Sequence, residues 1–436
     1  MPHWRRKAPT RAVAAVGGPV CISALPDEVI QLILSFLPAH DAVRTCVLAR
    51  RWRHLWRDAP ALRIHYIREW EDSDYPEIGV EKFDRFMDNL FSLRCRGAPL
   101  EYCEFDFDRP VSFFPYNPDA VRWIRRAFRC RARVLRFVFN ETIELPDVPL
   151  ISQHLTRLEV QCVSFHGDSS DFSECPLLVD QKMRECILEK NMWSPSLKML
   201  SIVNCEFTGN LLSFPSLVSL ELDCGENRAP FLESMPSLEE ATLIFDHTIK
   251  DLCSNNIFGD CGEDNCQGCS YFSGTTPVNN HTDCVLLNGV SEATDLKLLA
   301  HPDVYVFRRD LKWCPTFYNL KTLLLNECCL VGDLSVLICF LQHSPLLEKL
   351  TIQLEKAPTC LMDLEGLYNT EQPFTSDHLK FVPIECKEVN LCVWKILKTL
   401  STFGIPLKQI NVKQTSKCNE SGWRLALLGR SRVQLG

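Results

Sequence analysis

The sequence lacks any apolar run that approaches the length of a membrane span. The longest one, Leu334–Leu341 with a single serine inside it, is far shorter than the roughly 20 residues that a spanning helix needs. Residues 1–20 also lack the apolar core of a secretory signal peptide, since they hold four Lys or Arg residues and then only a weak Ala/Val patch. The sequence therefore predicts no transmembrane helix and a loose basic N-terminal tail.

Sequence motifs of the common enzyme classes are missing as well. There is no Gly-x-Gly-x-x-Gly, no phosphate-binding loop, no His-Glu-x-x-His and no Gly-x-Ser-x-Gly. The 11 histidines are scattered without the spacing of metal ligands. We therefore expect a non-catalytic protein that needs no cofactor.

The overall composition is that of an ordinary globular protein. The 436 residues are 46% hydrophobic and 23% charged, which argues against disorder, collagen and coiled coil. A net charge of −8 gives no electrostatic reason for the whole chain to bind nucleic acid. At this length one compact core is not expected, so the chain should form two or three domains or a repeat array.

Cysteine is the residue present in excess, with 23 copies. An odd number of cysteines without a signal peptide argues against a secreted disulfide framework. We therefore expect free thiols in a reducing compartment, the nucleus, the cytoplasm or both.

Most of the chain shows a repeated spacing, apolar-x-x-apolar-x-apolar, which is typical of the strand in a leucine-rich repeat. Most gaps between consecutive copies are 20 to 34 residues, and two are 42 and 55 residues. Leu178 is a candidate start for a degenerate copy inside the first long gap. The 11 copies are Leu100/Cys103/Phe105, Val134/Phe137/Phe139, Leu155/Leu158/Val160, Leu197/Leu200/Ile202, Leu217/Leu220/Leu222, Leu238/Ala241/Leu243, Ala293/Leu296/Leu298, Leu320/Leu323/Leu325, Leu347/Leu350/Ile352, Leu379/Val382/Ile384 and Leu407/Ile410/Val412.

The residues around the repeats support the same register. A Pro-Ser-Leu turn precedes three of the strands, starting at Pro195, Pro215 and Pro236. Proline two residues ahead of a strand fixes the entry turn without removing a ladder hydrogen bond. Cys205 and Cys328 occupy the position after the strand where the repeat consensus has Asn or Cys, so we interpret these thiols as structural.

The segment before the repeats has a different pattern. Ser23 is a candidate cap for a helix that starts with Pro26, Asp27 and Glu28 and runs to about Phe36. A second helix is expected from Asp41, and a third over residues 51–56. The first helix is apolar on more than one side, which a unit of about forty residues cannot bury. Part of its surface must therefore contact the rest of the chain or a partner protein.

The residues of this segment resemble an F-box. Residues 22–38, with the Leu-Pro opening at Leu25, are similar to its first half, and residues 42–56, with Arg51-Trp52 and Leu55-Trp56, to its second. An F-box followed by leucine-rich repeats is typical of the plant F-box/leucine-rich-repeat group. The resemblance implies an α/β protein with an N-terminal three-helix F-box and an irregular leucine-rich-repeat solenoid.

The resemblance also implies a role. F-box proteins are substrate receptors of cullin-based ubiquitin ligases: the F-box binds an SKP-type adaptor, which joins it to the cullin/RING ligase, and the repeats bind a target protein. Carried over by position, the adaptor contact would include Leu25, Pro26, Val29, Ile33, Leu37, Val47, Leu48 and Trp52. Of these, Val47, Leu48 and Trp52 would complete either the three-helix unit or its contact. The target protein is unknown.

The expected domains are a basic tail (1–20), the F-box (21–64), the solenoid (80–413) and a C-terminal tail (414–436). A loop at about 251–285 holds Cys253, Cys261, Cys266, Cys269 and Cys284. Only Cys266 and Cys269 have zinc-ligand spacing, and a structural zinc site needs a second regular pair. We therefore expect an inserted loop without a metal.

Two other functions remain open from the sequence. The first is a ligase-independent scaffold, whose repeats bind proteins while the F-box is degenerate or occluded. The second, less favoured, is nucleic-acid binding by a helix over Arg122–Arg133, which carries six arginines. An outer helix with a solvated charged face explains the same pattern better.

Overall fold

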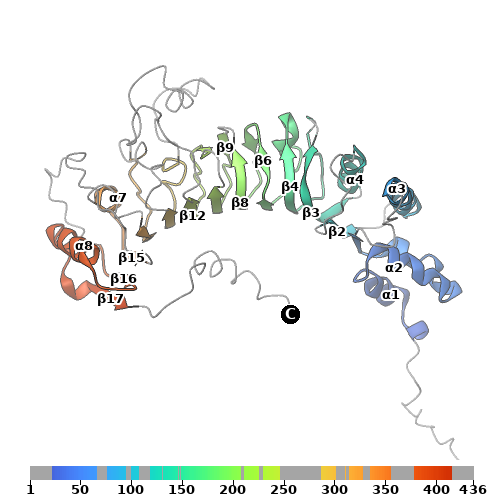
Figure 1. The fold of residues 1–436 in the computed structure, drawn as a ribbon, viewed down its shortest axis with the longest axis horizontal. Coiled ribbons are helices and arrows are strands. Elements are labelled where there is room, and N and C mark those ends of the chain that lie inside the picture. Colours follow the sequence, from blue (N-terminus) through green and yellow to red (C-terminus); the bar gives the residue numbers. More distant parts are fainter. Residues whose placement is uncertain are drawn as a thin grey trace, which may run out of the picture.

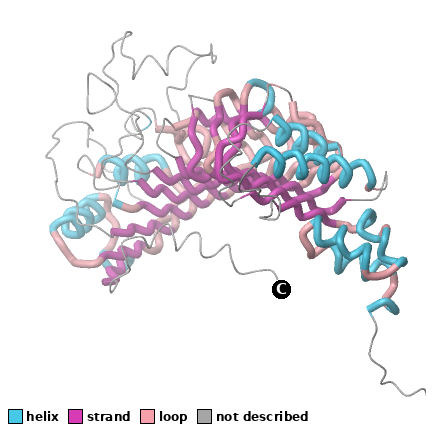
Figure 2. Tube along the Cα trace, turned by 45° about the vertical axis from the view of Figure 1, so that its right-hand side comes forward, coloured by secondary structure: helices cyan, strands magenta, loops and turns pink. Residues whose placement is uncertain are grey.

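The computed structural model describes residues 22–65, 76–94, 100–107, 118–129, 131–145, 147, 149–207, 211–224, 229–245, 286–300, 310, 314–327, 334–354 and 378–414. They form a curved body in which one long sheet follows the inner side, with helices and loops on the outer side (Figures 1 and 2). Helices and strands are thus mixed, as expected. Among the described residues, no helix is long and apolar enough to cross a membrane.

The N-terminal region consists of short helices. They are η1 (Ile22–Ala24), α1 (Asp27–Leu34), α2 (Ala39–Arg44), η2 (Thr45–Val47), η3 (Arg50–Arg53) and η4 (Leu55–Asp58), where η denotes a 3-10 helix. Pro26 occupies the cap position of α1, and Asp27 and Glu28 lie in its first turn, where carboxylates favour the helix dipole. Pro38 stands at the cap of α2.

Four details differ from the sequence prediction. The cap position of α1 is Pro26 and not position 23, which belongs to η1, and α1 ends at Leu34, two residues earlier than expected. α2 begins at Ala39, directly after Pro38, and not at Asp41. In place of a third continuous helix there are two 3-10 turns, because His54 between them has a non-helical backbone (φ −125°, ψ −7°).

In the part of the chain that the structure describes, one parallel sheet of 14 strands follows the N-terminal helices, and its spatial order follows the sequence. β6 (Ile187–Leu188) lies off the main path and pairs with β4 and β8. The strands on the path are β1 (Ala61–His65), β2 (Leu100–Phe107), β3 (Ala132–Leu145), β4 (Arg157–Phe165), β5 (Asp180–Arg184), β8 (Met199–Phe207), β10 (Ser219–Cys224), β12 (Glu240–Phe245), β13 (Asp295–Ala300), β14 (Thr322–Leu325), β15 (Lys349–Leu354), β16 (Val382–Cys386) and β17 (Ile410–Gln414).

The repeated apolar spacing coincides with these strands. Leu220 pairs with Leu200 on one side and with Ala241 on the other, and the same alignment continues through β13, β14 and β15. These side chains are buried, since alternate residues of a strand point to the same face. Stacking of equivalent positions therefore builds one continuous core.

One copy of the spacing needs correction, and one strand was not expected. In β3, Leu135 and Phe137 pair with Cys103 and Phe105, so this copy starts at Ala132 and not at Val134. β1, inside the segment assigned to the F-box, was not expected: Leu62 pairs with Cys103, and the sheet begins at Ala61. The boundaries of the domains otherwise remain predictions.

The degenerate copy at Leu178 is confirmed as β5. Its two inner positions after Leu178 are Gln181 and Met183, which align with the apolar residues of β4 and β8. Gln181 is thus a buried amide at a position that is leucine in both neighbouring strands.

The outer side of the sheet is irregular. It carries α3 (Pro76–Leu93), α4 (Pro118–Arg129), α7 (Ser335–His343), α8 (Leu391–Thr402), η6 (Gly167–Ser170) and η8 (Leu407–Gln409). A second, three-stranded sheet replaces helices in the middle, with β7 (Met192–Trp193), β9 (Leu211–Ser213) and β11 (Phe231–Leu232). Residues 1–20, the Cys-rich loop 251–285, Cys328 and residues 415–436 lie outside the described residues.

Candidate functional site

The first candidate site is an apolar surface on the N-terminal helices. α1 turns Ile30 and Leu34 into the core, which leaves Val29, Leu32 and Ile33 exposed on its other sides. Phe36, just past the end of α1, is 68% exposed. The helix is therefore apolar on a solvent face as well as on its core face, as the sequence indicated.

A second exposed pair lies at the end of η2. Val47 is 83% exposed and Leu48 is 70% exposed. The turn that presents them is held by two hydrogen bonds: Thr45 Oγ1 donates to the carbonyl of Ala42 (2.7 Å), and the amide of Leu48 donates to the carbonyl of Thr45 (3.0 Å). Isolated exposed apolar residues are common, but a group of this size on so small a unit indicates an interaction surface.

Arg51 connects the two halves of this unit. Its guanidinium donates to the carbonyl of Leu25 (2.6 Å) and to Oδ1 of Asp27 (2.8 Å). These bonds hold the entry of α1 against η3. The arginine of the Arg-Trp pair therefore stabilises the opening turn that contains Leu25 and Pro26.

The eight expected contact residues fall into three groups. Pro26, Val29, Ile33, Val47 and Leu48 are exposed, whereas Leu25 and Leu37 are half-buried against the core. Trp52 is only 9% exposed and belongs to the core, so a direct contact through it is not expected. Leu32 and Phe36 are also exposed, although the sequence analysis did not include them among the contact residues. Their apolar character within the first helix could have identified them.

The second candidate site is the inner face of the sheet. On the first strands, the residues that point away from the core form a row of alternating charges. Glu104 on β2 lies between Arg63 on β1 and Arg136 on β3, and Arg136 also contacts Glu159 on β4 (3.4 Å). Burial disfavours the charged form of Arg136, but Glu104 and Asp106 outweigh it and raise the pKa of Arg136. The sheet follows the inner side of the curved body (Figure 2), and these positions alternate with the core positions, so their side chains point away from the core.

Comparison with known proteins places the N-terminal region in a family: residues 22–63 match the F-box domain. Two F-box/LRR-repeat proteins from Arabidopsis thaliana are 29% and 57% identical over 262 and 237 residues, or 51% and 53% of this chain and 57% and 40% of theirs. The meiotic F-box protein MOF from rice (Oryza sativa subsp. japonica) is 27% identical over 358 residues, or 76% of this chain and 70% of its own length.

The chain therefore carries an F-box domain and is similar to plant F-box/leucine-rich-repeat proteins. FBD-associated F-box proteins of Arabidopsis thaliana are also related, at 28% and 31% identity. The chain spans 59% and 56% of the length of these two relatives.

The arginine-rich helix faces acidic residues. Arg122 lies within 3.9 Å of Asp84 and Asp88 on α3, and Arg126 forms an ion pair with Asp88. The helix also ends at Arg129, because residues from Ala132 onward form β3. The basic surface that nucleic-acid binding over Arg122–Arg133 would need is therefore divided between two elements and partly neutralised.

Among the described residues, two groups of side chains have the composition of metal ligands. One is His65, Glu104 and Asp106, whose carboxylates already pair with Arg63 and Arg136. The other is Cys314, Cys339 and His343 on the outer side of the sheet, without such paired cations.

Proposed function

We propose that this chain is the substrate-recognition subunit of an SCF-type ubiquitin ligase. In this role it catalyses no reaction itself. The F-box binds an SKP-type adaptor and through it a cullin/RING ligase, and the remainder of the chain holds a target protein. The observation that carries the proposal is the exposed apolar surface on the N-terminal helices, within the segment that matches the F-box domain.

The helices at the N-terminus support the first part of this role. We infer an F-box unit of three helical segments, the third being the 3-10 turns η3 and η4. Exposed Val29, Ile33 and Phe36 with Val47 and Leu48 would bury their surface on an adaptor, at about 25 cal/mol for each Å² removed from water. The core below them is formed by Ile30, Leu34, Trp52, Leu55 and Trp56, so the surface residues are free to serve binding.

The curved sheet supports the second part. We infer an irregular leucine-rich-repeat solenoid, since a single repeat cannot bury its apolar strand face and needs stacked neighbours. Its inner face presents polar and charged residues in rows, for example Glu104, Arg136 and Glu159. Such a surface suits a protein target with complementary charge. We place the complex in the nucleus, the cytoplasm or both.

A pair of charge substitutions tests the adaptor contact. Val47→Glu combined with Leu48→Glu places two carboxylates on the apolar surface without touching the core. We expect adaptor binding to weaken by at least about a hundredfold, because the interface would bury unpaired charges. Co-purification of the full chain with adaptor and cullin measures this effect.

Trp394→Glu is the matched control. Trp394 on α8 is 66% exposed, at the opposite end of the sheet, so the same kind of change there should leave adaptor binding intact (Figure 1). If the Val47/Leu48 variant still co-purifies with adaptor and cullin at the wild-type level, a ligase-independent scaffold explains the chain better. Binding to nucleic acid instead would give an affinity that falls steeply with salt.

A further inference from the structure

We propose that Cys314, Cys339 and His343 bind a zinc ion, with a water molecule as the fourth ligand. The site lies on the outer side of the sheet, far from the N-terminal apolar surface (Figure 1). It is also separate in sequence from the Cys-rich loop at 251–285, for which the spacing predicts no metal. Two thiols and one imidazole form a donor set that binds zinc in preference to magnesium or calcium, which prefer oxygen ligands.

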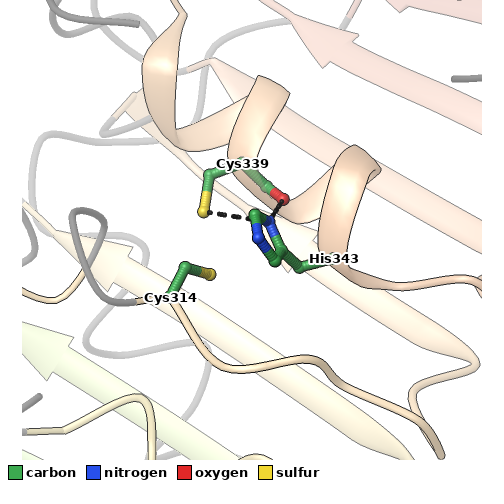
Figure 3. Close-up of side chains that lie close together, drawn as sticks. All are labelled: Cys314, Cys339 and His343. Atoms are coloured by element: carbon green, nitrogen blue, oxygen red, sulfur yellow. Dashed lines mark hydrogen bonds between the residues drawn. The ribbon is translucent and has the colours of Figure 1, made fainter. Parts of the chain in front are cut away.

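Two of the three ligands come from one helix. Cys339 and His343 are four residues apart on α7, so they lie one above the other on the same helix face. Both side chains extend from α7 toward Cys314, which points back at them (Figure 3). The donor atoms of the three residues lie within 4.8 Å of one another. Tetrahedral zinc holds sulfur and nitrogen ligands about 3.5–3.8 Å apart, so small side-chain rotations suffice to close the site.

The imidazole already has the hydrogen bond that a metal ligand needs. Nδ1 of His343 lies 2.9 Å from the carbonyl oxygen of Cys339. A carbonyl oxygen only accepts, so Nδ1 carries the proton and Nε2 keeps its lone pair. Metal-bound histidines commonly donate their second ring N–H to a backbone carbonyl in this manner, which fixes the tautomer and the ring orientation.

The third ligand is held in place by its own loop. The amide of Phe317, three residues after Cys314, donates to the carbonyl of His343 (2.8 Å). The ring of Phe317 packs on that of Phe340, with centroids 5.1 Å apart, and both rings are fully buried. The loop before β14 is therefore attached to α7 independently of the thiols, and Cys314 is preorganised beside Cys339.

The burial of the three residues fits a metal site that solvent can reach. Cys339 is buried, whereas Cys314 and His343 are half-buried, so solvent reaches part of the site. Hydrogen bonding to Cys339 and burial both raise the pKa of the Cys314 thiol. Zinc binds the deprotonated thiol, so binding at this site would release protons.

The test measures metal on the full chain, purified under reducing conditions and dialysed against metal-free buffer. Added zinc should bind at about one ion per chain, and cobalt in its place should give a thiolate-to-metal charge-transfer band. We expect Cys314→Ser and His343→Gln to weaken zinc binding at least about a hundredfold, as loss of a direct ligand exceeds the effect of outer-shell changes. The cobalt band should lose about half its intensity in Cys314→Ser, because one of two thiolates is gone.

Two control variants separate this site from other thiols. Cys392→Ser removes a buried cysteine of another outer helix, and Cys266→Ser removes the regular pair in the Cys-rich loop. Both should keep the zinc, and zinc should raise the melting temperature of both, but not that of Cys314→Ser. Absence of bound zinc, zinc kept in Cys314→Ser, zinc lost only in Cys266→Ser, or a Cys314–Cys339 disulfide that persists in reductant would each overturn the proposal.

Discussion

The guanidinium of Arg63 lies 2.7 Å from the carboxylate of Glu104, across the first two strands of the sheet. The same guanidinium donates to the carbonyl of Ser35, next to α1 (3.2 Å), and lies 4.7 Å from the ring centre of Tyr102. A backbone bridge joins Pro38 to Arg63 as well. Arg63 therefore connects the F-box to the sheet, and the two pack as one continuous structure.

Replacing Glu104 should destabilise the protein. Glu104→Gln keeps the shape but removes the carboxylate between Arg63 and Arg136. We expect a loss of about 1–3 kcal/mol, since both charge-assisted hydrogen bonds are weakened in a buried position. Urea denaturation measures the effect. Glu101→Gln, which alters the exposed ion pair with Arg133, should change stability by less than about 1 kcal/mol. Equal effects of the two substitutions would contradict this interpretation.

Replacing Gln181 should stabilise the protein. Its side chain is fully buried on β5, and neither amide atom has a hydrogen-bond partner among the described residues. The equivalent positions in the neighbouring strands are Leu158 and Leu200. Gln181→Leu should therefore raise the free energy of unfolding by about 1–3 kcal/mol. Gln161→Leu, on the adjacent strand but half-exposed, should give no comparable gain, and an equal gain there would refute the argument.

Titration of Asp180 should make the stability of the protein depend on pH. Burial raises the pKa of this carboxyl in spite of its ion pair with Arg157 (3.3 Å). Because the pKa of Asp180 is higher in the folded than in the unfolded state, the folded state binds the proton more tightly. The resulting stabilisation is fully present below the unfolded-state pKa of 3.8, and it is lost as the pH rises through the folded-state pKa. Asp180→Asn removes this loss. The stability of the variant relative to wild type should therefore increase between pH 4 and pH 7 in urea titrations. A difference that is constant or falls with pH would be inconsistent with this assignment.

Substitution at the opening of α1 should weaken adaptor binding. Leu25→Ala combined with Pro26→Ala removes an anchor pair next to the exposed apolar surface, and we expect a loss of a hundredfold or more (about 2.7 kcal/mol). Binding of the target by the sheet should be unchanged. Co-purification with the adaptor checks the first effect, and retention of the target checks the second.

Trp52→Ala is the comparison for trivial unfolding. Trp52 is buried, so its truncation should lower stability by about 3–5 kcal/mol as well as weaken binding. The Leu25/Pro26 variant should lower the melting temperature far less, because Pro26 is exposed and Leu25 only half-buried. A double variant that melts like Trp52→Ala would show that its binding defect is a folding defect.

The sequence by itself determined the strands and the apolar surface of α1. The leucine spacing predicts strands because alternate residues share a face, and ten of the 11 copies lie on strands in the expected register, the copy in β3 being the exception. The apolar character of α1 on several sides likewise indicated an exposed binding surface. Both are local patterns, set by the periodicity of a strand or a helix.

Only the tertiary structure decided which residues meet across the sheet. β1 does not belong to the repeated apolar spacing, so the sequence pattern did not predict it. Its pairing with β2 follows from the packing of the F-box against the start of the sheet. The start of the copy in β3 was set by pairing of Phe137 with Phe105, which outweighed an equally good apolar spacing two residues later. Cys314 comes close to Cys339 and His343 because stacking of repeats brings a loop and a helix 25 residues apart into contact, a distance that no local pattern encodes.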